Sequence, residues 1–155
     1  MTALRAIFRS PAGLAGAIIV GLFLAIAALA MIWTPYDPLA ISLSDRFAPP
    51  SPGRWLGGDE FGRDVLSRLM AGAGTSASIA IVSVALATLI GVPLGLIAGF
   101  FGGVVDRILA SLNDALLAFP GILLAMALLA ILGPSRWGVV IALGVAFAPT
   151  VARVV

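Results

Sequence analysis

Four long stretches without a charged side chain constrain the fold of this chain more than any other feature of its sequence. A helix needs about 20 mostly apolar residues to cross the roughly 30 Å hydrocarbon core of a bilayer. A single Arg or Asp at the centre of such a helix would cost about 3 kcal/mol. The apolar parts of the four stretches are residues 13–33, 76–101, 115–132 and 137–152. The sequence therefore predicts an all-α integral membrane protein with four transmembrane helices.

The composition excludes most soluble functions. Charged residues make up 10% of the 155 residues and hydrophobic residues 61%, whereas a soluble domain has roughly 25% and 45–50%. A soluble enzyme, a disordered tail and a nucleic-acid-binding module are excluded on this ground. The chain has no Cys, His or Lys, so the residues of a Cys/His zinc site, a Ser-His dyad and a P-loop are missing. We expect no catalytic residue, no cofactor and no metal, and we expect any ATP hydrolysis to be done by another polypeptide.

The first apolar stretch has two interpretations. Arg5 and Arg9 precede it, and Ala28-Leu29-Ala30 has the A-x-A form of a signal-peptide cleavage site. Its length of about 21 residues exceeds the roughly 7–15 of a signal-peptide core, and Trp33 and Tyr36 suit an interfacial aromatic belt, so a retained helix is favoured. Arg5 and Arg9 predict a cytoplasmic N-terminus, although the Arg residues of the remaining loops do not support that orientation.

Residues 34–75 are expected to form an external loop. Pro and Gly residues crowd positions 34–58 and favour turns. Apolar residues then recur at helical spacing, with Asp59 as the expected N-cap and Asp64–Arg68 as an i,i+4 ion pair. The pattern predicts a short amphipathic helix over about 59–70 on the outer membrane surface.

Three acidic residues of this segment could in principle bind a metal or act as an acid–base pair. They are Asp59, Glu60 and Asp64. Their spacing does not place all three on one helix face, and no Asn- or Gly-rich calcium loop surrounds them. We interpret them as solvated charges.

The second predicted span contains a glycine stripe. Gly91, Gly95 and Gly99 recur every four residues and fall on one helix face, where small residues let another backbone approach closely. Pro93 removes one hydrogen bond of the helix and is expected to kink it. Plain helix packing and a flexing joint in a gate both remain open as interpretations.

Polar residues separate the second and third predicted spans, at the expected inner interface. They are Asp106, Arg107, Asn113 and Asp114. Polar groups near the membrane mark a solute pathway or a contact between subunits. Asp114 also begins a predicted span, where it can interact with water or with the helix dipole. Both interpretations stay open.

One segment resembles a known family. Residues 55–68, WLGGDEFGRDVLSR, are similar to the LGTDxxGRDxxSR signature of binding-protein-dependent ABC transporter permeases, specifically the "C" subunits of the dipeptide/oligopeptide/nickel type. Residues 35–38 and 90–103 also match that family. The sequence departs from it at Gly58, Arg54 and Gly74, where Thr, His and Arg are usual. The matching signature residues, expected on the external helix, are Asp59, Gly62, Arg63, Asp64, Ser67 and Arg68.

The resemblance implies a six-helix subunit in a bacterial or archaeal plasma membrane, with its N-terminus in the cytoplasm. Residues 1–33 would be the tail and first transmembrane helix, residues 34–75 the external loop, and residues 76–155 an incomplete permease core that stops before the coupling loop. The implied partners are a second permease subunit, two ATP-binding subunits and an external substrate-binding protein, with no nucleic acid. The implied function is import of peptides or similar small solutes by alternating access.

Two other functions remain as alternatives. One is a complete four-helix transporter such as a drug/proton exchanger, and the other is a structural membrane subunit. An exchanger needs a carboxylate inside the membrane, and residues 13–33, 76–101 and 115–132 contain none. The sequence does not distinguish a dipeptide, an oligopeptide or a nickel chelate as the solute.

Overall fold

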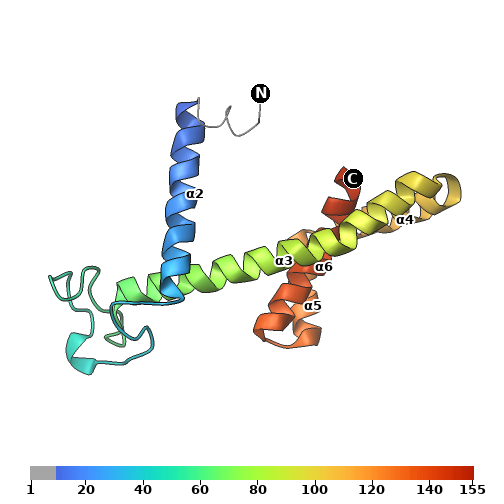
Figure 1. The fold of residues 1–155 in the computed structure, drawn as a ribbon. Coiled ribbons are helices and arrows are strands. Elements are labelled where there is room, and N and C mark those ends of the chain that lie inside the picture. The colour runs from blue at the N-terminus through green and yellow to red at the C-terminus, as the bar shows by residue number, and fades with distance from the viewer. Residues whose placement is uncertain (1–9) are drawn as a thin grey trace. The chain divides into compact units, whose positions relative to one another are not determined.

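The structure is a computed structural model that describes residues 10–155, and it is built of α-helices joined by one long loop and short breaks (Figure 1). The tail with Arg5 and Arg9, on which the predicted orientation depends, lies outside the described residues. The chain divides into two compact units, Met1–Ala77 and Ser78–Val155. The helices are α2 (Pro11–Ala30), α3 (Val65–Phe101), α4 (Gly103–Leu117), α5 (Gly121–Leu132) and α6 (Arg136–Val154), and the long loop contains a 3-10 turn, η1 (Leu43–Asp45).

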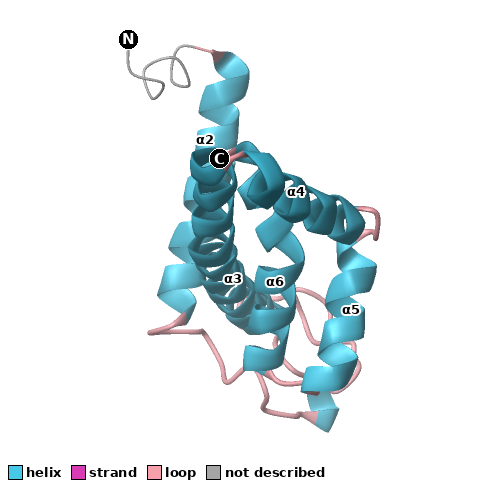
Figure 2. Ribbon diagram, turned by 90° about the vertical axis from the view of Figure 1, so that its right-hand side faces the viewer, coloured by secondary structure: helices cyan, strands magenta, loops and turns pink. Residues whose placement is uncertain are grey.

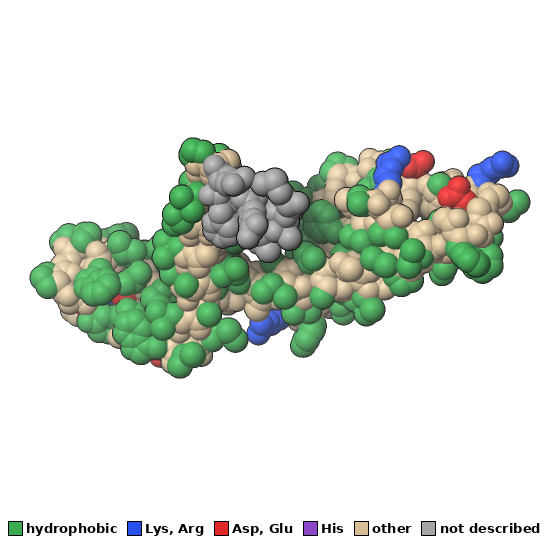
Figure 3. Space-filling view, turned by 45° about the horizontal axis from the view of Figure 1, so that its top comes forward, with side chains coloured by type: hydrophobic (Ala, Val, Ile, Leu, Met, Phe, Trp, Pro, Cys, Tyr) green, Lys and Arg blue, Asp and Glu red, His purple; other side chains and the backbone are tan. Residues whose placement is uncertain are grey.

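Three helices among the described residues are long and apolar enough to cross a membrane: α2, α3 and α6. The number becomes four if α4 and α5, which are bent by 88°, form one broken span. Figure 3 shows hydrophobic side chains over much of the surface, and large apolar residues of α2, α3 and α5 are exposed. Lipid is the solvent that such a surface requires. The predicted all-α membrane class is confirmed, and the described residues contain three or four candidate spans.

The third predicted span, residues 115–132, is not a single helix. α4 ends at Leu117 and α5 begins at Gly121, with Pro120 in an extended conformation between them. A Pro lacks the N–H that continues a helix, and it also disfavours helical geometry in the residue before it, here Phe119. Pro120, which lies within the predicted span, therefore separates two helices. α5 has only 12 residues, too few to cross the hydrocarbon core alone.

α2 begins with a side-chain cap and packs closely against α3. The Ser10 hydroxyl accepts a hydrogen bond from the Gly13 N–H at 3.0 Å, and Pro11 occupies the first turn, where its missing N–H has no intrahelical role. A Cβ added at Gly74 of α3 would lie 3.2 Å from the carbonyl oxygen of Ala27. The glycine thus lets α2 approach the first turns of α3 closely.

The short helix predicted over about 59–70 is replaced by a turn and the start of α3. Residues 59–64 form turns, and α3 runs without interruption from Val65 to Phe101. Its 37 residues are nearly twice the roughly 20 that a bilayer requires. Pro93 lies inside α3, and the helix continues past it. The loop predicted at residues 34–58 is confirmed, apart from the 3-10 turn.

α6 is the central helix of the second unit. It packs against α5 and α4 (Figure 2), and Ala142 and Ala146 of α6 form a small core with Ala125 of α5. In lipid, helices associate through close contact rather than through loss of water, so small side chains favour such packing. The buried residues of α6 are Gly138, Val140, Ala142, Gly144, Ala146, Ala148, Pro149 and Ala152.

Two of the three glycines in the predicted stripe pack against α6. A Cβ at Gly91 would lie 2.6 Å from the carbonyl oxygen of Ala148, and one at Gly95 would lie 2.7 Å from that of Ala152. A Cβ at Gly99 would have no atom of the described residues within 4 Å outside its own stretch of helix. The contact between α3 and α6 therefore ends before Gly99. We call the contact at Gly91 and Gly95 the glycine seam.

Gly91→Ala and Gly95→Ala are each expected to lower the stability of the protein. A new methyl group at either position would meet a backbone carbonyl, and overpacking costs about 1–3 kcal/mol. The same change at an open helical position raises the stability by up to about 1 kcal/mol, because Ala has a higher helix propensity than Gly. Thermal unfolding of the purified protein in detergent measures both effects, with Gly99→Ala as the matched control. Midpoints for Gly91→Ala and Gly95→Ala equal to or above that of Gly99→Ala would contradict the glycine seam.

Candidate functional site

The signature residues gather in the loop between α2 and α3 and in the first turn of α3. We call the group formed by Asp59, Gly62, Arg63, Asp64, Ser67 and Arg68 the signature cluster. The structure brings all six together, although the segment is not the single helix that we predicted. The cluster has two halves, one centred on Asp59 and one on Asp64.

Asp59 accepts several hydrogen bonds at once. Its Oδ1 accepts from the backbone N–H groups of Phe61 at 2.8 Å and Arg63 at 3.0 Å. Its Oδ2 accepts from the Arg63 Nε at 2.8 Å and from the Arg68 guanidinium. Burial alone would raise the pKa of Asp59, but these hydrogen bonds outweigh it and hold the pKa well below its usual range. Asp59 therefore stabilises a turn and does not cap a helix. Arg68 pairs with Asp59, whereas we predicted that it would pair with Asp64.

Gly62 is required by the backbone of this turn. Its φ is +70°, and a Cβ there would lie 1.7 Å from the carbonyl oxygen of Ser42. The Gly62 carbonyl accepts a hydrogen bond from Arg54 at 2.6 Å, and Arg54 also binds Asp45 at 2.8 Å. The sequence patterns did not reveal these roles of Asp45 and Arg54. Asp45 and Arg54 are two of the four charged residues at positions 34–58, and their opposite charges were the available signal.

Asp64 and Ser67 form the buried half of the cluster, with exposed fractions of 2% and 0%. The Asp64 Oδ2 accepts hydrogen bonds from the Ser67 N–H at 2.8 Å and the Ser67 hydroxyl at 2.7 Å. The Ser67 oxygen in turn accepts from the N–H of Tyr36 at 3.0 Å. Asp64 thus takes the capping role that we assigned to Asp59. Through Ser67 it also anchors the chain just after α2.

The polar residues of the predicted inner interface belong to α4, in the second unit. Asp114 pairs with Arg153 of α6 at 3.2 Å, and both side chains are more than half exposed. An exposed ion pair contributes about 0–1 kcal/mol, so this pair orients α4 more than it stabilises it. Arg107 does not line the adjoining groove of about 300 Å³. The groove is lined by, among others, Gly95, Gly99, Asp106, Asn113, Asp114 and Arg153.

The signature cluster and the groove of the second unit are suited to positioning segments of the chain and to letting a polar solute pass. They are less suited to making or breaking covalent bonds. Among residues 10–155, no three acidic side chains come together as a metal site would require. The charge of Asp59 is paired with guanidinium groups. The groove of the second unit combines an open glycine, an amide and carboxylates, as a polar path or a contact with another chain would.

The hydrogen bonds on Asp59 are expected to stabilise the loop from neutral pH down to about pH 4 and to be lost in stronger acid. A carboxyl whose pKa in the folded state lies below its unfolded value of 3.8 contributes stability above that value and loses it as the pH falls toward the folded pKa. Trp33 and Trp55 report on the loop by fluorescence once Trp137 is replaced by Phe. The signal should stay constant from pH 7 to about 4 and change below.

Asp59→Asn keeps a turn-forming side chain but removes the ion pairs, so this variant should unfold at a lower temperature at pH 7. Asp37→Asn is the matched control, because Asp37 is a carboxylate of the same loop outside the signature cluster. Identical acid profiles and thermal midpoints in Asp59→Asn and the unsubstituted protein would contradict the role of Asp59.

Comparisons with known proteins agree with the resemblance of the signature. A family model for the N-terminal TM domain of oligopeptide transport permease C matches residues 2–50. The glutathione transport system permease protein GsiD of Pectobacterium atrosepticum is 41% identical over 152 residues, covering 97% of this chain and 50% of that protein. The dipeptide transport system permease protein DppC of Alkalihalophilus pseudofirmus is 37% identical over 153 residues, covering 99% of this chain and 50% of the relative.

The nickel transport system permease protein NikC of Escherichia coli is 36% identical over 138 residues, 89% of this chain and 50% of NikC. The chain thus spans about half the length of the relatives that it matches. The matched stretches cover 89–99% of this chain. The chain is therefore related, over nearly all of its own length, to the permease family of dipeptide, oligopeptide and nickel transport systems.

Proposed function

We propose that the chain forms part of the transmembrane permease subunit of an ATP-driven importer of peptides or similar small solutes. The observation that carries the proposal is the 41% identity, over 97% of the chain, to a permease protein of a transport system. The named solutes of the relatives are glutathione, dipeptides and nickel, so the solute class is left at small peptides and comparable solutes.

In this proposal the subunit to which the chain belongs supplies half of a solute pathway, and a second permease subunit supplies the other half. The pathway opens alternately to each side of the membrane, and ATP binding shifts the balance between the two states. This chain has no Lys and hence no P-loop lysine, so two separate ATP-binding subunits would hydrolyse the ATP. An external binding protein would deliver the solute.

The glycine seam and the signature cluster have different roles in this mechanism. The glycine seam holds α3 on α6 at Gly91 and Gly95, while the open position at Gly99 leaves the end of α3 free to move against the polar groove. The signature cluster fixes the loop between α2 and α3 as a rigid surface on the outer side. The protein would be a multi-pass component of a bacterial or archaeal plasma membrane with its N-terminus in the cytoplasm, in line with the excess of Arg in the tail.

Uptake by proteoliposomes tests the transport proposal. The vesicles contain the whole protein, the second permease subunit and the ATP-binding subunits, and a labelled dipeptide, glutathione or nickel is offered with the binding protein. Uptake of at least one solute is expected only when ATP is present on the side of the ATP-binding subunits. The purified protein alone should hydrolyse no ATP. ATP turnover by that preparation, or uptake that does not depend on nucleotide, would overturn the proposal.

Cysteine labelling tests the proposed orientation. The chain has no Cys, so Ser51→Cys in the loop and Ser111→Cys on α4 each create a single reactive site, and both positions are exposed. A membrane-impermeant maleimide added to intact cells should label Ser51→Cys and not Ser111→Cys. Permeabilised cells, in which both variants should react, are the control. The reverse labelling pattern would contradict a cytoplasmic N-terminus.

A further inference from the structure

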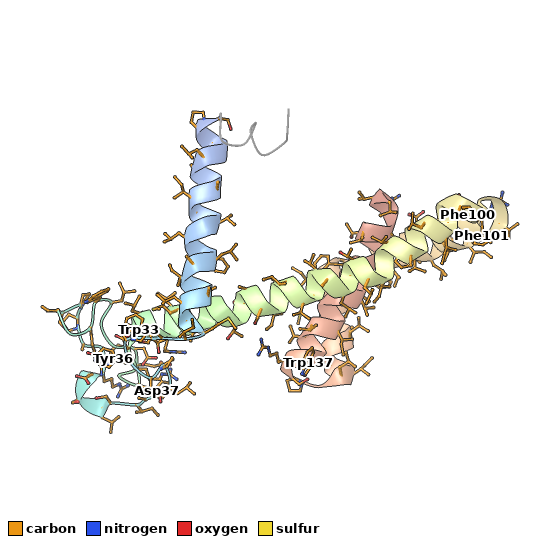
Figure 4. All side chains as sticks on the ribbon, viewed as in Figure 1. Trp33, Tyr36, Asp37, Phe100, Phe101 and Trp137 are labelled. Atoms are coloured by element: carbon orange, nitrogen blue, oxygen red, sulfur yellow. The ribbon has the colours of Figure 1, made fainter. Side chains whose placement is uncertain are left out.

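A small cavity of about 230 Å³ lies beside the signature cluster, within the first unit. Three aromatic residues, Trp33, Tyr36 and Trp55, line it together with Asp64. Figure 4 shows Trp33 and Tyr36 in the same part of the loop after α2. Aromatic faces around a carboxylate are the surroundings in which proteins bind organic cations.

One oxygen of Asp64 has no hydrogen-bond partner among the described residues. Oδ2 accepts both hydrogen bonds from Ser67, whereas Oδ1 is buried and accepts none from the described residues. The whole residue is only 2% exposed. Buried polar atoms are almost always hydrogen-bonded, and a buried charge that is not paired is costly. A positively charged hydrogen-bond donor is the group that would both satisfy the Asp64 Oδ1 and pair with the carboxylate.

The described part of the chain does not supply that donor. Arg63 and Arg68 bind Asp59. Arg54 lies over the Tyr36 ring, 5.4 Å from its centroid, but it binds Asp45 at 2.8 Å and the Gly62 carbonyl at 2.6 Å. Its charge is thus neutralised by Asp45 and does not prevent a second cation from entering the cavity.

We infer that this cavity binds an ammonium group that carries at least one N–H. The N–H donates a charge-assisted hydrogen bond to the Asp64 Oδ1, and the aromatic faces of Trp33, Tyr36 and Trp55 attract the positive charge. A trimethylated ammonium has no N–H and cannot satisfy Oδ1. The inference rests on the loop geometry alone and holds whether or not the protein is an importer.

A second cavity indicates what the ammonium is attached to. It measures about 490 Å³, shares Trp33 and Trp55 with the first cavity, and extends along apolar residues of α2 and α3 such as Phe23 and Met70. A ligand with an ammonium head and an apolar tail would fill both cavities. The ammonium has two sources: the ethanolamine headgroup of a phospholipid or a free soluble amine.

Ligand-observed NMR tests the site with ethanolammonium as the probe and choline as its trimethylated comparator. The protein is held in nanodiscs of phosphatidylcholine, whose headgroup has no N–H. Saturation transfer from the protein should reach ethanolammonium and not choline. Asp64→Asn should weaken the binding of ethanolammonium about tenfold or more, because the charge is lost. Asn also caps helices well, so the loop should stay folded.

Asp37→Asn is the matched control, since its carboxylate lies in the same loop outside the cavity and accepts the Leu39 N–H at 2.9 Å; it should bind as the unsubstituted protein does. Trp55→Leu is a second test that leaves the cap of α3 intact, and it should also weaken binding. No saturable transfer to ethanolammonium, equal transfer to choline, or full binding in both Asp64→Asn and Trp55→Leu would overturn the inference.

The two sources are then distinguished by the lipid. Nanodiscs in which phosphatidylethanolamine replaces part of the phosphatidylcholine present the same headgroup at high local concentration. If the lipid is the source, ethanolammonium should lose its signal in these discs. If a soluble amine is the source, the signal should be unchanged.

Discussion

The cap that Asp64 forms on α3 is the interaction on which the first unit depends. One carboxylate oxygen fixes the first turn of the helix through the N–H and hydroxyl of Ser67. The same hydroxyl oxygen holds the N–H of Tyr36, 31 residues earlier in the chain. Because Asp64 and Ser67 are buried, the hydrogen bonds between them do not compete with water. Together these two side chains join the chain after α2 to the start of α3.

The second unit depends on a different principle, the close approach of backbones. Lipid solvates large apolar side chains as well as a protein does, so helices associate where small residues permit contact. Gly91 and Gly95 provide this contact on α3, where they meet the backbone of α6 at Ala148 and Ala152. Where the contact stops, at Gly99, a polar groove opens.

Charge and hydrophobicity were sufficient to predict the membrane class and most of the spans, whereas features set by local backbone geometry were missed. The uncharged stretches identified α2 and α6, because a charge at the centre of a membrane helix is costly. The helix expected from Asp59 failed because Gly62 adopts a positive φ that a regular helix excludes. The break at Pro120 was predictable from Phe119-Pro120, since both residues disfavour helix. The bond between Arg54 and Asp45 depends on how the loop folds back, which no spacing reveals.

Hydrogen exchange at the Tyr36 amide tests most directly whether Asp64 and Ser67 organise the first unit. Among the described residues, this N–H donates only to the Ser67 hydroxyl oxygen, which is far from it in sequence, so its protection reports the folded loop and not local helix formation. Exchange measured by mass spectrometry should be slow at Tyr36, and about tenfold faster in Ser67→Ala, the loss expected for one part-buried hydrogen bond. Rapid exchange at Tyr36 in the unsubstituted protein, or a rate unchanged by Ser67→Ala, would contradict the account.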